Sequence, residues 1–202
     1  MKKQQLAILL SKLHTLPNPQ PRLEQYPTPS GIAADALCIA HLWNDIQEKN
    51  IADLGCGNGI LGCAALLLGA KHAHFVDIDE KALAVSSQNV DLLQKVMNTT
   101  YPATYHATDI TSFHQPADCI LQNPPFGVQQ EHADRAFLLQ AVKAPTAYSF
   151  HKLDTQDFVT RFVRQHGKTA TLLKTYPFPL WKSMKHHTKR VKHTDVGFWR
   201  IA

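Results

Sequence analysis

The chain has 202 residues, of which 44% are hydrophobic and 18% are charged, and its net charge is +5. This composition excludes a wholly disordered chain, and no apolar run approaches the ~20 residues of a membrane span or forms the core of a signal peptide. The four cysteines form no C-x-x-C pair, so we expect neither a zinc site nor a disulfide framework. Free thiols fit a reducing compartment, and we expect a cytoplasmic protein.

Apolar residues at helical spacing predict a first helix over residues 3–15, which the prolines at 17, 19 and 21 end. A connector follows over 24–30, and Ser30 is predicted to cap a helix over 32–47. Further strands are predicted at 51–54, 73–76, 103–106, 119–122 and 146–150, and further helices at 59–68, 80–94, 133–142 and 155–165. Two last strands, at 169–176 and 191–201, would be joined by a long basic loop.

This alternation predicts an α/β fold, with a mostly parallel sheet covered by helices on both faces and an antiparallel edge from the last strands. We expect a single domain over 1–202, with an N-terminal helix and connector in 1–30 and a basic strand pair and loop in 161–202. That last segment carries ten Lys or Arg and one acid, whereas the rest of the chain has a net charge of −4. A basic end predicts either a polyanionic partner or a solvated face.

A glycine-rich turn, Asp53-Leu54-Gly55-Cys56-Gly57-Asn58-Gly59, joins a predicted strand to a predicted helix. Glycines let a ligand approach the backbone, and Asp53 can orient the loop or accept from a ligand ammonium. Asp77, at the end of the next strand, can accept both hydroxyls of a ribose, and Asp79 can cap the following helix. Asp109 is either an acceptor for an adenine amino group or a loop residue. Because the turn also fits the dinucleotide pattern G-x-G-x-x-G, it predicts a nucleotide-type site and leaves the ligand open.

The sequence Asn123-Pro124-Pro125-Phe126 directly follows the fourth strand of the alternation. The Asn123 side-chain oxygen and the Pro124 carbonyl can each accept one N–H of an amino group on a flat ring, and Phe126 can stack on the ring. Accepting both protons frees the nitrogen lone pair for attack on a methyl group carried by a positive sulfonium. Such a displacement is governed mainly by positioning. The loop therefore predicts methyl transfer to an exocyclic amino group.

Together these motifs resemble the class I S-adenosylmethionine methyltransferases. Five pieces of sequence are similar, more narrowly, to the archaeal and eukaryotic methyltransferase-like proteins that make N6-methyladenosine in small-subunit ribosomal RNA. They are LEQYPT at 23–28, DID at 77–79, NPPFG at 123–127, DRAF at 134–137 and YSFHK at 148–152. The resemblance covers about residues 22–200. It implies a Rossmann-like, seven-stranded, mostly parallel sheet with an antiparallel last strand, and an RNA (adenine-N6) methyltransferase activity.

The resemblance also implies a cofactor, a catalytic loop and partners. The cofactor is S-adenosyl-L-methionine, and the family's contact positions match Gln25, Thr28, Gly55, Asn58, Ile60, Asp77, Asp109 and Ile110. The glycine turn itself adds Asp53, Gly57 and Gly59. Asn123, Pro124, Pro125 and Phe126 match the family's catalytic loop. Members of the family pair with a small zinc-binding activator subunit, so we expect such a subunit as a partner in addition to RNA.

The basic end supplies the candidate contacts to the RNA backbone, unless these residues only keep a long loop solvated. They are Lys182, Lys185, Lys189, Arg190 and Lys192. Histidines also lie in this segment, but without a Cys or an acid at ligand spacing they do not predict a metal site. His151 and Lys152 follow the fifth strand, where we favour a packed histidine over a catalytic one.

Several alternatives remain open at this stage. A protein glutamine N5 methyltransferase or a guanine N2 methyltransferase would use the same loop chemistry, although the glutamine enzymes usually have Tyr where Phe126 stands. A non-catalytic RNA-binding module predicts a broken cofactor motif, and this one is complete. An NAD-dependent oxidoreductase gives Asn123 no role, and a sequence-specific DNA methyltransferase would need a separate base-reading domain.

Overall fold

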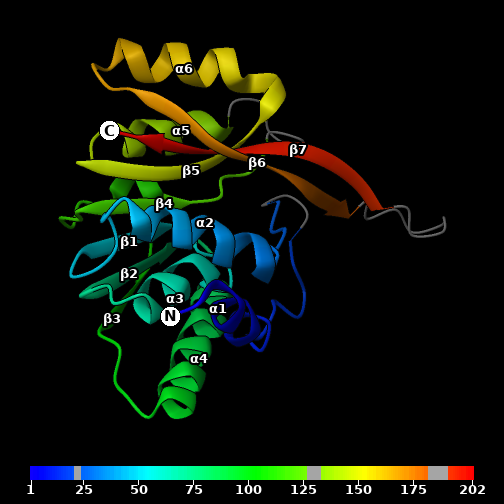
Figure 1. The fold of residues 1–202 in the computed structure, drawn as a ribbon, viewed down its shortest axis with the longest axis vertical. Coiled ribbons are helices and arrows are strands. Elements are labelled where there is room, and N and C mark those ends of the chain that lie inside the picture. The colour runs from blue at the N-terminus through cyan, green and yellow to red at the C-terminus, as the bar shows by residue number, and fades with distance from the viewer. Residues whose placement is uncertain (21–23, 127–132, 182–190) are drawn as a thin grey trace.

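The computed structural model describes residues 1–20, 24–126, 133–181 and 191–202. Seven strands form one sheet in the order β3-β2-β1-β4-β5-β7-β6 (Figure 1). The first five pair in parallel, and β7 runs antiparallel to both of its neighbours. The strands are β1 (Asn50–Leu54), β2 (His72–Asp77), β3 (Ala103–Ala107), β4 (Cys119–Gln122), β5 (Thr146–Lys152), β6 (Ala170–Trp181) and β7 (Val191–Ile201). The predicted α/β fold with an antiparallel last strand is confirmed.

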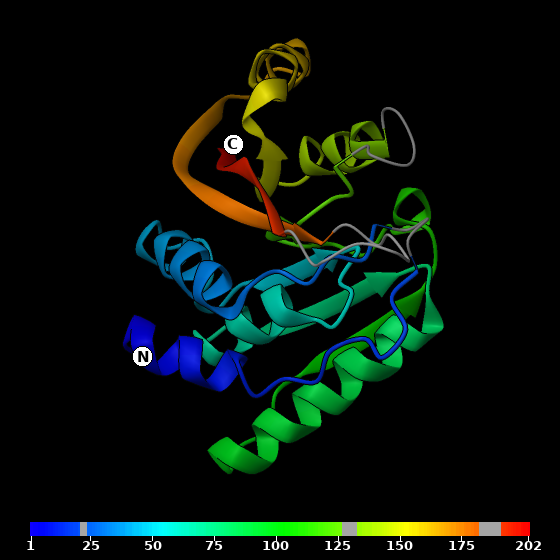
Figure 2. The ribbon, with the colours of Figure 1, turned by 90° about the vertical axis from the view of Figure 1, so that its right-hand side faces the viewer.

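Helices cover both faces of this sheet (Figures 1 and 2). One layer holds α1 (Lys3–Leu10), α2 (Ser30–Leu42), α3 (Ile60–Leu67) and α4 (Glu80–Met97), and the other holds α5 (Ala133–Ala141) and α6 (Gln156–Gln165). Two short 3-10 helices, η2 (Ile110–Ser112) and η3 (Leu153–Thr155), complete the chain order. No helix in the described residues is both long and apolar enough to cross a membrane.

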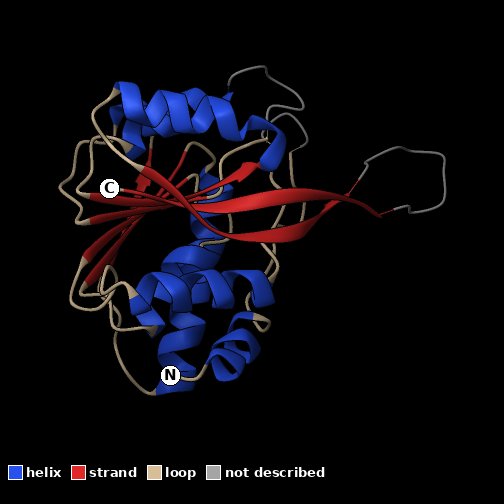
Figure 3. Cartoon of the chain, turned by 45° about the horizontal axis from the view of Figure 1, so that its top comes forward, coloured by secondary structure: helices blue, strands red, loops and turns tan. Residues whose placement is uncertain are grey.

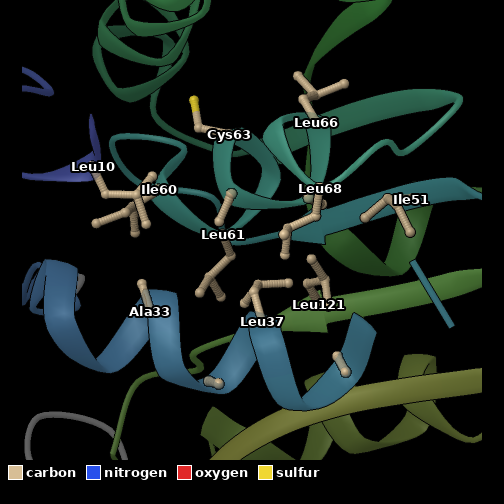
Figure 4. Close-up of a cluster of buried hydrophobic side chains, with 14 of the residues drawn as sticks. Leu10, Ala33, Leu37, Ile51, Ile60, Leu61, Cys63, Leu66, Leu68 and Leu121 are labelled. Carbon is tan, nitrogen blue, oxygen red and sulfur yellow. The ribbon is translucent and has the colours of Figure 1, made fainter. Parts of the chain in front are cut away.

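The larger core lies between the sheet and the layer of α1 to α4. In Figure 4, Ala33 and Leu37 of α2 face Leu61 of α3 and Leu121 of β4. The side chain of Leu37 is fully buried, and so is that of Ile51 on β1. Burying a side chain of this size stabilises the fold by about 1.5–3 kcal/mol, so this packing fixes where β1 and α3 meet at the glycine-rich turn.

Several predicted element bounds are wrong, and the helix predicted over 80–94 continues to Met97. The first helix ends at Leu10, and the helix predicted over 32–47 spans Ser30–Leu42 with Pro29 as its N-cap, so Ser30 belongs to the first turn. The fifth strand continues to Lys152 because His151 and Lys152 pair with β7. His151 therefore lies within a strand and does not follow one.

The sixth strand extends through two prolines that were predicted to lie in a loop. Pro177 and Pro179 pair in register with Asp195 and His193 of β7. Proline has no N–H to donate, but β6 is at the edge of the sheet, where one side of a strand needs no partner. β5 pairs with β7 only from Val196 onward, so residues 177–181 and 191–195 project as a two-stranded arm beyond the carboxyl end of β5 (Figure 3).

Candidate active site

A cavity of about 780 Å³ lies at the carboxyl ends of β1, β2 and β4, where a parallel α/β sheet usually binds its ligand. In the structure we use the name connector for the described residues between α1 and α2, which are 11–20 and 24–29. The connector forms part of the cavity wall through residues that include Thr15, Leu16 and Tyr26. Ten of the eleven residues predicted to contact a cofactor line this cavity. They are Gln25, Thr28, Asp53, Gly55, Gly57, Asn58, Ile60, Asp77, Asp109 and Ile110.

Gly59 is the exception, and its role is conformational. It has a φ of 77°, and a Cβ there would lie 2.9 Å from Ser86 Oγ and 3.0 Å from the Phe75 ring. Gly57 differs, because a Cβ on it would meet nothing within 4 Å. The predicted approach of a ligand to bare backbone is therefore possible at Gly57, whereas Gly59 allows the turn to pack against α4.

Asp53 orients the glycine-rich turn, which was one of its two predicted roles. Its Oδ2 accepts a hydrogen bond of 2.8 Å from the Gly62 amide, and the residue is only 1% exposed. Burial raises the pKa of the Asp53 carboxyl to about 8. A group held with such a pKa in a cavity wall is typical of functional sites.

Asp77 is buried, and both of its carboxylate oxygens accept backbone hydrogen bonds. Oδ2 accepts from Gly57 and Oδ1 from Asp79, each at 2.9 Å. Burial raises the pKa of Asp77 above its ordinary value. Each carboxylate oxygen has two lone pairs, so each retains one for a hydroxyl of a ligand. The residue therefore fixes the turn and still offers a bidentate acceptor.

Several polar residues at the cavity form hydrogen bonds within the protein. Asp79 caps α4 through the Lys81 amide, as predicted, and its Oδ2 also accepts from Gln25 Nε2 at 2.9 Å. Asn58 Nδ2 donates to the His14 carbonyl at 3.0 Å. Asp109 Oδ1 caps η2 by accepting from the Thr111 amide. These contacts shape the cavity wall and fasten the connector over it.

Sequence reasoning missed Asn89, which organises this wall from α4 without lining the cavity. The residue is fully buried. Its Oδ1 accepts from the His14 amide at 2.7 Å, and its Nδ2 donates to the carbonyls of His14 and Asn58 at 3.0 and 2.9 Å. The connector and the glycine-rich turn are therefore tied to one side chain. Only the tertiary structure brings these residues together, so no local sequence signal marks Asn89.

Ile78 was also missed, although it directly follows Asp77. Its side chain is 60% exposed and lines the cavity. The signal in the sequence was an apolar residue directly after an acid at the end of a predicted strand. Ile78 offers an apolar wall for a flat ring next to the acceptor that would hold a ribose.

The Asn123 loop enters the cavity with two of its four predicted catalytic residues. Asn123 and Pro125 line it, whereas Pro124 and Phe126 do not. Asn123 Nδ2 donates to Thr28 Oγ1 at 3.0 Å. Its Oδ1 is buried and has no hydrogen-bond partner in the described part of the chain. Phe126 packs edge-on against Phe178 of β6, with ring centroids 5.7 Å apart, so in this structure its ring belongs to the core around the arm.

His151 is a packed histidine, as the sequence favoured. It is buried in β5, its Nε2 lies 2.7 Å from Ser149 Oγ, and burial lowers the pKa of its imidazole to about 3. Ser149 also accepts from Gln122 Nε2 at 3.0 Å, directly before the Asn123 loop. The neutral His151 contacts the Asn123 loop indirectly, through Ser149 and Gln122, and is a poor proton acceptor near pH 7.

The predicted RNA contacts fall almost wholly outside the described residues. Lys182, Lys185, Lys189 and Arg190 lie between β6 and β7, and only the backbone of Lys192 is described, at the start of β7. Their contact with RNA therefore stays a prediction.

The fold and the cavity together define a Rossmann-like methyltransferase. The chain belongs to the methyltransferase small-domain family, whose model matches residues 33–147. Over its whole length it is 32% identical to the rRNA N(6)-adenosine-methyltransferase METTL5 of Danio rerio and 30% identical to that of Drosophila melanogaster, covering 99% and 96% of those proteins. A crystal structure of a candidate RNA methyltransferase from Pyrococcus horikoshii is 35% identical, with a TM-score of 0.90, over 100% of this chain and 98% of that one. The family resemblance of the sequence motifs is confirmed.

Proposed function

We propose that this protein transfers a methyl group from S-adenosyl-L-methionine to the N6 amino group of an adenine in RNA, and that the RNA is that of the small ribosomal subunit. The observation that carries the proposal is the Asn123 side chain, whose buried Oδ1 has no partner among the described residues and whose residue lines the cavity. Full-length relatives named as rRNA adenosine methyltransferases support the choice of substrate.

The cavity residues fit S-adenosyl-L-methionine. Asp77 offers acceptors for a ribose diol, Ile78 offers an apolar wall for the adenine ring, and the open side of Gly57 leaves backbone for the rest of the ligand. Asp53 is the buried acid for an ammonium group, because a cation beside it would lower the pKa that burial has raised. When bound, the cofactor supplies an electrophilic methyl group on a sulfonium.

The Asn123 loop would prepare the nucleophile without a strong base. Asn123 Oδ1 accepts one N–H of the substrate amino group, and the Pro124 carbonyl is the proposed acceptor for the second. The nitrogen lone pair is then directed away from its ring and toward the methyl group, and the gain in rate comes from alignment and electrostatic complementarity. Phe126 would have to leave its packing against Phe178 to stack fully on the base.

Guanine N2 and the glutamine amide are the closest competing acceptors, since both present a planar amino group to the same loop. Phe126 stands where the glutamine enzymes usually have Tyr. The relatives that match the whole chain are named for adenosine. An oxidoreductase is excluded by the family, and these considerations favour adenine.

We assign two surfaces of the protein to partners. The arm of residues 177–181 and 191–195 projects past the sheet edge at which the cavity lies, and the predicted RNA contacts Lys182, Lys185, Lys189 and Arg190 come between its two strands in the sequence, outside the described residues. We assign this arm to the RNA backbone. The expected zinc-binding activator subunit rests on the family resemblance, and β3 offers it a strand at the edge of the sheet. The catalytic chain should melt at a higher temperature and turn over faster with that subunit present, because a partner that binds only the folded state stabilises it.

The decisive experiment incubates the protein with labelled cofactor and total RNA and identifies the modified nucleoside by digestion and mass spectrometry. We expect N6-methyladenosine from the wild type. Asn123→Ala should keep most of its cofactor affinity and lose about 10²-fold or more in turnover. Asn50→Ala, at the opposite end of the sheet, is the matched control. A different modified nucleoside, or an Asn123→Ala variant as fast as wild type, would refute the proposal.

A further inference from the structure

We infer that Tyr26 supplies an aromatic face on which the target base stacks while Asn123 holds the amino group of that base. The inference rests on the proposed function and deepens it, since it names a further contact to the same substrate. Tyr26 belongs to the sequence LEQYPT, in which the motifs assign it no role.

A base that leaves the RNA stack needs a new surface for its flat faces. Enzymes that act on a base commonly hold it between aromatic or apolar side chains. Phe126, the predicted stacking residue, does not line the cavity and packs edge-on against Phe178. In this arrangement the Asn123 loop offers the base an acceptor and the apolar side chain of Pro125, but no ring. Without a movement of Phe126, an aromatic face has to come from another segment.

Two aromatic side chains of the described residues line the cavity, Tyr26 on the connector and Phe137 on α5. Phe137 stands against the glycine-rich turn, because a Cβ on Gly55 would lie 3.0 Å from its ring. Its ring therefore borders the part of the cavity that we assign to the cofactor. Tyr26 is only partly buried, so part of its surface stays open to a ligand. Tyr26 is thus the ring that the cavity offers to a second flat molecule.

The connector places Tyr26 within reach of a base held by Asn123. Thr28 Oγ1 lies 3.0 Å from Asn123 Nδ2, so the connector touches the catalytic side chain at residue 28. A proline follows each of Tyr26 and Thr28, and a residue before proline is restricted to extended conformations. Extended residues two positions apart point to the same side, with Cα atoms at most about 7 Å apart. Both side chains line the cavity, in agreement with this geometry.

Contacts on the N-terminal side of the ring fix its backbone. The Tyr26 amide donates to the Glu24 carbonyl at 2.7 Å. Gln25 Nε2 donates to Asp79 Oδ2 at 2.9 Å, which ties the connector to the cap of α4. A side chain whose backbone is already ordered loses less conformational freedom when a ligand binds, so more of the stacking free energy appears as affinity for the base.

The competing role for Tyr26 is a contact to the cofactor, and the two roles predict different measurements. Removing a cofactor contact would raise the cofactor dissociation constant, and saturating cofactor would restore the rate. Removing a base contact would lower the rate on limiting RNA even when the cofactor is saturating. The cofactor dissociation constant also reports on the connector itself, because a released connector would weaken cofactor binding.

The test measures the initial rate of the full chain on total RNA, with saturating labelled cofactor and limiting RNA. Tyr26→Leu and Tyr26→Met remove the ring and keep an apolar side chain, whereas Tyr26→Phe keeps the ring. The matched control is Tyr101→Leu, which replaces another partly buried tyrosine that packs on the core and does not line the cavity.

We expect both ringless variants to lose about 5-fold to 150-fold in initial rate, the range that stacking on one base implies. Tyr26→Phe should retain most of the wild-type rate, and Tyr101→Leu should match the wild type. The cofactor dissociation constant, measured by calorimetry, should stay close to wild type in every variant.

Three results would overturn the inference. The ringless variants could be as fast as wild type, they could weaken cofactor binding in proportion to their loss of rate, or Tyr26→Phe could be as slow as Tyr26→Leu. A wild-type protein that methylates no adenine, or an Asn123→Ala variant as fast as wild type, refutes the proposed function instead. These two parent proteins are measured first, so the failure of one claim is distinguishable from the failure of the other.

Discussion

Replacing Asn89 with alanine should weaken cofactor binding, although Asn89 does not line the cavity. The change removes three hydrogen bonds, two to the His14 backbone and one to the Asn58 carbonyl. The His14 carbonyl keeps its bond from Asn58 Nδ2, so two backbone groups lose the partner that Asn89 supplied. Each buried polar group left without a partner costs about 1–3 kcal/mol. Because His14 is exposed, water can replace part of what its amide loses. We therefore expect the free energy of unfolding to fall by about 2–3 kcal/mol.

The effect on affinity follows from the same contacts. Residues Thr15 and Leu16 line the cavity directly after His14, so a released connector must be ordered again when the ligand binds. If that ordering takes up most of the lost free energy, the cofactor dissociation constant should rise roughly 10-fold to 100-fold. Calorimetry well below the melting temperature measures it, with Gln88→Ala, an exposed neighbour on α4, as control. Wild-type affinity in a folded Asn89→Ala protein would show that the connector does not depend on Asn89.

Three further changes test other parts of the site. Asp77→Ala should weaken cofactor binding by roughly 10-fold to 150-fold, because it removes a charge-assisted acceptor worth about 1.5–3 kcal/mol; unchanged affinity by calorimetry would reject the ribose assignment. For Asp53, the folded-state pKa of about 8 lies above the ordinary 3.8, so this group stabilises the fold below about pH 4 and that contribution is lost as pH rises to about 8. The melting temperature of the wild type minus that of Asp53→Asn should therefore fall across this window, and a flat difference would contradict the assigned pKa. The variant Lys185/Lys189/Arg190/Lys192→Gln neutralises the basic residues between and beside the strands of the arm. It should weaken RNA binding about equally for all sequences and flatten the salt dependence by roughly 0.7 log units of affinity per log unit of salt for each lost contact. An unchanged slope would favour a solvated loop.

Local patterns were sufficient to predict most of the sheet. The strand at residues 119–122 has the predicted bounds, and β1 and β3 differ from prediction by one residue at one end. β1 and β4 are almost wholly buried, and a glycine or a proline follows each within two residues, so the information lies within a few neighbouring residues. The roles of Asp53 and Asp77 were predictable for the same reason, because each acid lies at or next to the end of a predicted strand.

The contacts that a pattern could not predict join distant segments. Phe126 has the right chemistry to stack on a base, but its partner in this structure is Phe178, from a strand whose prolines argued for a loop. That prediction failed because edge position, which permits Pro177 and Pro179, depends on the order of all seven strands. Pairs such as Thr28 with Asn123, or His14 with Asn89, likewise follow from the packing of the connector over the sheet.

The connector also links the glycine-rich turn to the Asn123 loop. Between His14 and Thr28 it is fastened to α4 through Asn89, to the cap of α4 through Gln25 and Asp79, and to the catalytic loop through Asn123. The described residues between α1 and α2 therefore line the proposed cofactor site and also contact the side chain of Asn123. We therefore expect cofactor affinity and turnover to be coupled through these contacts, and comparing both quantities in the Asn89→Ala variant measures that coupling.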